Sequence, residues 1–283
     1  MQPTSHYIDL PTGIRAHHLT WGDGAHPPIV LNHATGFLAR LWDPVAQRLA
    51  ERYTVYAADA RGHGDSDKPA PQADNYHWLR FVEDHQAFLD ALGLRGLPFA
   101  GHSAGAAVGL YLAADHPEYY TSLVAIEPIV MPGGFQPDET RREQMAEGAR
   151  RRRSVFGSVD EVYEQYRSRP TFELWPDGIL RLYAEHGTFV REDGQVQLKC
   201  PGEIEGAVFA NSASLDVWSA LPRIQAPVLV LRGERTEGFL SMVAEQVAAR
   251  IPNGRLETIP GAGHLSPMEV PDAVADLILD FVP

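Results

Sequence analysis

Residues 101–105 read GHSAG, a G-x-S-x-G pattern that places a serine between two glycines. An apolar run leads into the pattern, and an alanine-rich helical stretch leads out of it. A serine on such a tight strand-to-helix turn holds its hydroxyl above the sheet, where the flanking glycines relieve crowding. The bare pattern is weak, and a serine that merely caps its helix is the alternative. In this context the pattern predicts that Ser103 is a nucleophile.

A serine hydroxyl becomes a strong nucleophile when a neighbouring base removes its proton. His264, in IPGAGHLSPMEVP, follows the last predicted strand. The glycines before it let a loop carry the imidazole toward the strand ends, where open α/β sheets place their sites. His33, His63 and His102 are rivals, but each lies in a motif with another natural interpretation. We predict that His264 is the base.

The negative charge that develops on a substrate under attack needs hydrogen-bond donors. The backbone N–H of Ala104 directly follows the nucleophile and opens a helix, where N–H groups are free to stabilise an anion. A second donor is expected from the loop after the third strand, LNHATGF. We assign that donor to the N–H of Thr35.

The elements that must position these residues are short apolar runs alternating with helical patterns, which is typical of an α/β protein with a mainly parallel sheet covered on both faces. The predicted strands are Tyr7–Leu10, Ile14–Thr20, Ile29–Asn32, Thr54–Ala58, Leu97–Ala100, Leu123–Ile126, Val228–Arg232 and Arg255–Ile259. The predicted helices are Trp42–Glu51, Asn75–Leu92, Ala104–Asp115, Met242–Arg250 and Ala273–Phe281. Near Pro128 and Pro132 the alternation stops, and the chain becomes arginine-rich and helical until about Ala220.

Four motifs together resemble those of the α/β-hydrolase fold family, and they occur in the family's order. VLNHATGF resembles its oxyanion loop with Ala34 in place of the usual glycine, DARGHGDSDKP its Asp-x-Arg-Gly-x-Gly-x-Ser turn, GHSAG its nucleophile elbow and PGAGHLSPMEVP its histidine loop. The resemblance implies an eight-stranded, mostly parallel sheet flanked by helices, formed by residues 1–130 and 221–283. Residues 131–220 would form the helical cap. Serine at 103, where the dehalogenase and epoxide-hydrolase branches have aspartate, argues against those branches.

The acid that would orient His264 is not at the family's usual place. That place, a Gly-x-x-Asp after the penultimate strand, reads Gly-Glu-Arg-Thr at 233–236 here, and threonine cannot carry the charge. Our preferred hypothesis is relocation to Glu127, at the end of the strand that follows the elbow helix, where the position before a proline favours extended backbone. Haloalkane dehalogenases and some lactonases of this fold use a glutamate at the corresponding strand end. The alternatives are Glu234 or Glu237 in the loop itself, or no acid at all.

Composition limits the partners and the location. The formal net charge of −13 argues against a nucleic-acid partner because Lys and Arg are not in excess. The basic run at 150–153 is interpreted as a solvated helix face, with an anion or partner site as the alternative. Cys200 is the single cysteine, which excludes an intrachain disulfide and a cysteine-rich zinc site. We see neither a signal peptide nor an apolar stretch long enough for a membrane span, and we expect a cytoplasmic protein.

These features predict a serine hydrolase that cleaves a carboxylic ester, with Glu127 as the acid. The alternatives are a lactonase or C–C bond hydrolase with the same triad, a cofactor-free perhydrolase, and a catalytically silent ligand-binding protein. A neutral, small-molecule ester or lactone is expected in a mostly apolar pocket between core and cap. The residues proposed to line that pocket are Phe37, Trp42, Trp78, His102, Trp175, Trp218 and Leu265. We expect no cofactor and no metal, since no glycine-rich nucleotide loop and no H-E-x-x-H spacing occurs. The oligomeric state stays open.

Overall fold

Eight strands form one sheet in the computed structural model, which describes residues 1–133 and 139–283. The sheet order is β1-β2-β4-β3-β5-β6-β10-β11. Only the pairings β1–β2 and β2–β4 are antiparallel, so β2 alone runs against the rest of the sheet. The strands are β1 Thr4–Asp9, β2 Arg15–Trp21, β3 Pro28–Asn32, β4 Thr54–Ala58, β5 Leu97–His102, β6 Tyr120–Ile126, β10 Val228–Gly233 and β11 Gly254–Ile259.

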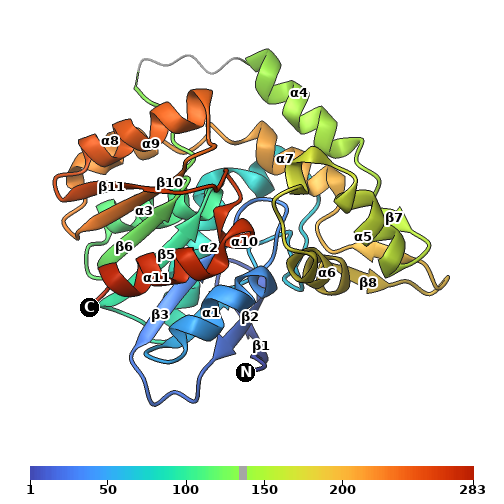
Figure 1. Ribbon diagram of the computed structural model, residues 1–283, viewed down its shortest axis with the longest axis horizontal. Helices are drawn as coiled ribbons and strands as arrows, with labels where there is room; N and C mark the ends of the chain where they lie inside the picture. The colour runs from blue at the N-terminus through green and yellow to red at the C-terminus, as the bar shows by residue number, and fades with distance from the viewer. Residues whose placement is uncertain (134–138) are drawn as a thin grey trace.

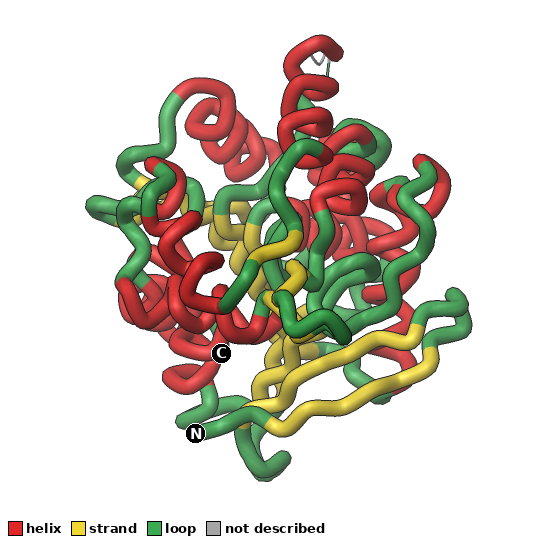
Figure 2. Tube along the Cα trace, turned by 90° about the vertical axis from the view of Figure 1, so that its right-hand side faces the viewer, coloured by secondary structure: helices red, strands yellow, loops and turns green. Residues whose placement is uncertain are grey.

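Helices cover both faces of this sheet, which runs through the interior (Figure 2). On one face, α1 and α11 bury the valine, leucine and isoleucine side chains that alternate inward from the strands. On the other face, α2, α3 and α9 enclose the larger of the two core clusters. Because the central strands are apolar toward both faces, they are buried throughout. The core helices are η1 Ala39–Trp42, α1 Asp43–Leu49, η2 Ala73–Tyr76, α2 Trp78–Ala91, α3 Ala104–Asp115, α8 Val217–Ala220, η4 Leu221–Arg223, α9 Gly238–Arg250, α10 Ser266–Glu269 and α11 Pro271–Phe281.

The architecture confirms the predicted fold class: a mostly parallel eight-stranded sheet flanked by helices. All eight predicted strands are present, with ends that differ by at most three residues, and the predicted helix Ala104–Asp115 matches α3 at both ends. The helix predicted for Trp42–Glu51 is observed as α1, which begins at Asp43 and has Pro44 in its first turn. The 3-10 turn η1 directly precedes it.

Residues 139–210 pack beside the core, at the right of Figure 1, on the side where the loops following β3, β4 and β10 emerge. Their elements are α4 Glu139–Arg150, β7 Val155–Phe156, α5 Val159–Arg167, η3 Pro170–Phe172, α6 Asp177–His186, β8 Thr188–Val190, β9 Val196–Leu198 and α7 Gly202–Ala210. The expected cap boundary falls close to residues 134–138, which lie outside the described residues. The segment is mostly helical, and it also holds a three-stranded antiparallel sheet of order β7-β9-β8, which the short runs in the sequence did not reveal.

None of the helices within residues 1–133 and 139–283 combines the length and the apolar character that a membrane span requires.

Candidate active site

Ser103 sits on the turn between β5 and α3, with φ 56° and ψ −116°. This backbone conformation is costly for a residue with a side chain and recurs at functional sites. The neighbouring glycines are sterically required. A Cβ on Gly101 would lie 2.8 Å from Ala106 Cα, and one on Gly105 would lie 2.6 Å from the carbonyl oxygen of Asn32. The G-x-S-x-G pattern therefore reflects close packing of the elbow against β3 and α3.

The oxyanion loop, residues 33–37, is tied to the loop after β4 at several points. The N–H of Gly36 donates to His63 Nε2 at 3.0 Å, and the N–H of Ala60 donates to His33 Nε2, also at 3.0 Å. In the part of the chain that the structure describes, the N–H groups of Thr35 and Ala104 donate to no other group. Both proposed donors are therefore free: Thr35 in a loop whose shape is fixed by other bonds, and Ala104 at the first position of α3.

Both histidines that tie down this loop are held in the neutral form. Burial lowers the pKa of His63 to about 3 and the pKa of His33 below its usual value. Each ring donates through Nδ1, His33 to Ala34 O at 2.8 Å and His63 to Arg61 O at 2.9 Å. The Nε2 atoms are consequently free to accept from the backbone. This explains why neither histidine, both rivals for the role of base, is available to remove a proton.

His264 follows β11 on a loop held at both of its sides. Glu269, on α10, accepts from the N–H of Gly263 at 2.5 Å and from the N–H of Leu265 at 3.2 Å. Nε2 of His102 lies 2.8 Å from the carbonyl oxygen of His264. Burial lowers the pKa of His102 to about 3, so its ring is neutral and Nε2–H is the donor in this contact. The main chain of His264 is thus fixed by groups on either side of it.

Glu127 lies at the end of β6 and faces His264. Its Oε2 is 3.3 Å from His264 Nδ1, while Oε1 accepts from the N–H of Gly233 at 2.6 Å and from the hydroxyl of Thr236 at 2.7 Å. The carboxylate side chain is 1% exposed and the imidazole 29% exposed. A buried carboxylate with this set of donors is compensated, and the open side of the imidazole can reach a substrate.

The backbone of Glu127 departs from the expectation of an extended conformation before Pro128. Its φ is 50°, in the left-handed region that residues with a side chain seldom adopt. The N–H of Glu127 donates to Leu231 O on β10 at 2.8 Å, and the side chain is held by three further contacts. These tertiary bonds outweigh the local preference of a residue that precedes proline.

The two local substitutes for the acid are engaged elsewhere or exposed. Glu234 is exposed and accepts from the N–H of Gly261 at 2.8 Å, which ties its loop to the loop before His264. Glu237 is exposed and stands immediately before α9. Of the carboxylates weighed from the sequence, the structure brings Glu127 to the imidazole.

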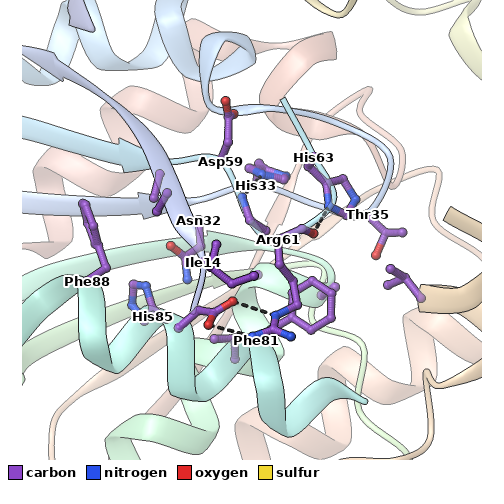
Figure 3. A pocket seen from close by; sticks show the side chains of 18 of the residues that line it. Ile14, Asn32, His33, Thr35, Asp59, Arg61, His63, Phe81, His85 and Phe88 are labelled. Atoms are coloured by element: carbon purple, nitrogen blue, oxygen red, sulfur yellow. Dashed lines mark hydrogen bonds and ion pairs between the residues drawn. The ribbon is translucent and has the colours of Figure 1, made fainter. Parts of the chain in front are cut away.

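A cavity of about 60 Å³ extends from the oxyanion loop into the core between the sheet and α2 (Figure 3). Thr35, Ala104 and Trp78 are part of its wall, whereas Ser103 and His264 are not. Arg61 crosses the cavity wall and pairs with Asp84 through two contacts of 2.6 and 2.7 Å, drawn as dashed lines in Figure 3. The volume of this cavity suits a few water molecules rather than a substrate.

The other residues expected to line a substrate pocket separate into distinct environments. Phe37 packs against Trp175 with ring centroids 5.5 Å apart, and Leu265 belongs to the same apolar cluster as Trp175. Trp42 is buried in the core cluster that α1 and α11 cover. Trp218 lies under Arg250, on α9, at 4.4 Å. The structure therefore brings Phe37, Trp175 and Leu265 together between core and insertion, but not Trp42 or Trp218.

One group of potential metal ligands exists among the described residues. His17, Asp59 and Asp65 each offer an atom within 4.8 Å of the others. His17 Nδ1 and Asp59 Oδ2 are 2.7 Å apart, and Lys199 pairs with Asp65 at 2.7 Å. These contacts already satisfy the group as a structural network.

The comparison with known families agrees with this geometry. A model of the alpha/beta hydrolase fold family matches residues 27–271, which is most of the chain. The chain belongs to the α/β-hydrolase fold family.

Relatives within the α/β-hydrolase fold family span nearly the whole chain. A fluoroacetate dehalogenase of a Burkholderia species is 27% identical and aligns with 92% of this chain and 88% of its own. A bifunctional esterase/perhydrolase of Acinetobacter calcoaceticus is 26% identical over 98% of this chain and 99% of its own. The crystal structure of E-2-(acetamidomethylene)succinate hydrolase matches with a TM-score of 0.83 over 99% of each chain, at 23% identity. The family thus includes several hydrolytic chemistries on one fold.

Two residues at this α/β-hydrolase site were missed from the sequence. Thr236 cannot serve as the acid, but its hydroxyl can donate to an acid that comes from another strand. Glu269 lies five residues after His264, and the turn of α10 brings it back to the histidine loop. A carboxylate at this spacing inside an otherwise apolar stretch was the available signal, since a buried carboxylate needs donors.

Proposed function

We propose that this α/β hydrolase is a serine hydrolase that cleaves carboxylic esters through an acyl-enzyme. One observation carries the proposal: the buried carboxylate of Glu127 lies 3.3 Å from Nδ1 of His264. A carboxylate in this place holds the imidazole in the tautomer whose Nε2 accepts a proton. The strained serine at 103 and the two free N–H groups beside it supply the other parts that acyl transfer requires.

In the proposed reaction, His264 removes the hydroxyl proton as Ser103 Oγ attacks the carbonyl carbon. The N–H groups of Ala104 and Thr35 donate to the oxyanion, and Glu127 stabilises the imidazolium. His264 then gives the proton to the leaving alcohol, and the acyl-enzyme forms. Water, deprotonated by the same imidazole, attacks the acyl carbon and releases the acid and free Ser103.

The proposed substrate is a small neutral ester or lactone. Phe37, Trp175 and Leu265 present apolar surface between core and insertion, which favours a neutral group. A lactone is opened by the same steps because its leaving alcohol stays attached to the acyl chain. The esterase/perhydrolase relative supports trying acetate with hydrogen peroxide as well.

The test combines labelling with a substrate panel. An activated serine reacts with a fluorophosphonate, whereas a silent ligand-binding site does not, and Ser103→Ala should abolish labelling. Turnover of p-nitrophenyl esters, lactones and vinylogous diketones separates esterase, lactonase and C–C bond hydrolase. Near-normal esterase activity in Ser103→Ala would disprove the assignment.

A further inference from the structure

Glu205, on α7, is a buried carboxylate placed over the oxyanion loop. The residue is 8% exposed, and its Oε2 lies 2.8 Å from Arg152 Nη2. Among the residues that the structure describes, none donates a hydrogen bond to its other oxygen, Oε1. Within the described chain, Oε1 is not one of the fully enclosed polar atoms that lack a partner. A buried carboxylate oxygen without a donor is costly unless something else supplies one.

Arg152 neutralises the charge of Glu205. Arg152 departs from the solvated face predicted for residues 150–153, because its side chain is 11% exposed, the same as that of Glu205. Arg152 Nη2 also donates to the carbonyl oxygen of Cys200 at 3.0 Å. Burial raises the pKa of Glu205, and the guanidinium groups of Arg152 and Arg169 oppose that rise. A paired carboxylate of this kind favours a neutral hydrogen-bond donor over a cation.

The position of Oε1 relative to the oxyanion loop follows from Gly36. This residue has φ +83°, and a Cβ added to it would overlap Glu205 Oε1. Gly36 follows Thr35, so standard bond lengths place Oε1 within about 9 Å of the Thr35 nitrogen. Glu205 also shares a face of α7 with Val208, three residues later, which is in the wall of the cavity beside Thr35. The N–H of Thr35 is the proposed donor to the acyl carbonyl, and we take the acyl group as the part of the substrate that reaches Oε1.

We propose that Glu205 Oε1 forms a subsite that accepts a hydrogen bond from a neutral N–H or O–H on the acyl group of the substrate. Because Oε1 lies within about 9 Å of the Thr35 nitrogen, a donor three or four atoms from the carbonyl carbon is within its reach. The preferred substrate class is then an ester whose acyl chain carries an amide or hydroxyl group. This inference rests on the proposed ester hydrolysis and specifies its substrate.

Two isosteric esters test the subsite. p-Nitrophenyl 3-acetamidopropanoate has an amide N–H where p-nitrophenyl 5-oxohexanoate has a methylene, and their leaving groups are the same. Because a hydrogen bond to a charged group is among the stronger ones, we expect wild-type kcat/KM to favour the acetamido ester by roughly ten- to hundred-fold. In Glu205→Gln, the amide oxygen replaces the acceptor for Arg152 and the NH₂ group faces the substrate. The ratio should then fall to about one.

Glu203→Gln is the matched control, since Glu203 is on the same helix but exposed, and it should keep the wild-type ratio. If Glu205→Gln does not fold, Glu205→Asp is the second variant. It keeps the charge but moves the carboxylate oxygen away from the substrate, so it should also lower the ratio. A wild-type ratio near one, or an unchanged ratio in the Glu205 variants, would overturn the subsite while leaving ester hydrolysis intact. If the wild-type protein hydrolyses neither of the two esters, both proposals are overturned.

Discussion

The hydroxyl of Thr236 donates to Oε1 of Glu127 at 2.7 Å. Thr236 occupies the place where an α/β hydrolase usually keeps its acid, and Glu127 comes from the end of a different strand. Gly233, at the end of β10, adds its N–H to the same oxygen. The loop after β10 therefore holds Glu127, the carboxylate that we propose as the acid.

Replacing Glu127 with glutamine should lower kcat by about 10³- to 10⁴-fold, because a neutral amide cannot stabilise the imidazolium and can favour the wrong tautomer. Steady-state kinetics on a p-nitrophenyl ester provides the measurement. The matched control is Glu237→Gln, at an exposed position, which should stay within a few-fold of wild type. The opposite pattern would return the acid to the loop after β10.

Thr236→Val removes the hydroxyl that donates to Glu127 but keeps the shape of the side chain. We expect kcat to fall about tenfold, since a hydrogen bond to a charged group is worth roughly 1.5–3 kcal/mol and Gly233 still holds the oxygen. Thr236→Ser retains the hydroxyl and should keep most of the activity. Equal activity of the valine and serine variants would show that the hydroxyl does not position Glu127.

Glu269→Gln tests whether the histidine loop is positioned by this carboxylate. An amide presents one acceptor oxygen, so one of the N–H groups of Gly263 and Leu265 would lose its partner. We expect kcat and the rate of fluorophosphonate labelling to fall together by about tenfold, with little change in KM. Asp272→Asn, at an exposed position close by, is the control. A lower melting temperature with unchanged kcat would indicate a purely structural role.

Buried neutral histidines predict an acid-sensitive fold. Burial lowers the pKa values of His63, His85 and His102 to about 3, whereas the unfolded chain takes up protons near pH 6.5. Stability is therefore full above pH 6.5 and declines as the pH falls toward 3, by up to about 1.4 kcal/mol per pH unit for each histidine. Urea unfolding between pH 7 and 4 measures the slope.

His85→Gln should reduce that slope, because glutamine can keep the contact that His85 Nε2 makes with the hydroxyl of Tyr120 at 2.6 Å without titrating. A slope identical to that of wild type would show that His85 does not contribute to acid sensitivity.

The sequence predicted features whose signal is local. Ser103 lies in a five-residue motif, and the apolar run before Glu127 identified its strand and the end of that strand. Thr236 bonds to a residue that is far away in the sequence, and Glu269 reaches the histidine loop through a short helical turn. Sequence pattern alone shows neither contact. Trp218 is the opposite case, because it was predicted to line the pocket but lies under Arg250. The sequence around an aromatic residue does not show whether its side chain lines a pocket or packs under a neighbouring side chain.

The N–H of Ser103 donates to the carbonyl oxygen of Ile126 at 2.9 Å, directly before Glu127. The proposed nucleophile and acid thus directly follow the adjacent central strands β5 and β6, whose amides are expected to exchange with solvent only on global unfolding. Local opening of the insertion, to admit substrate or release product, would leave these two groups in register. The spacing between Ser103 and Glu127 is therefore expected to be as rigid as the hydrogen-bond ladder between β5 and β6.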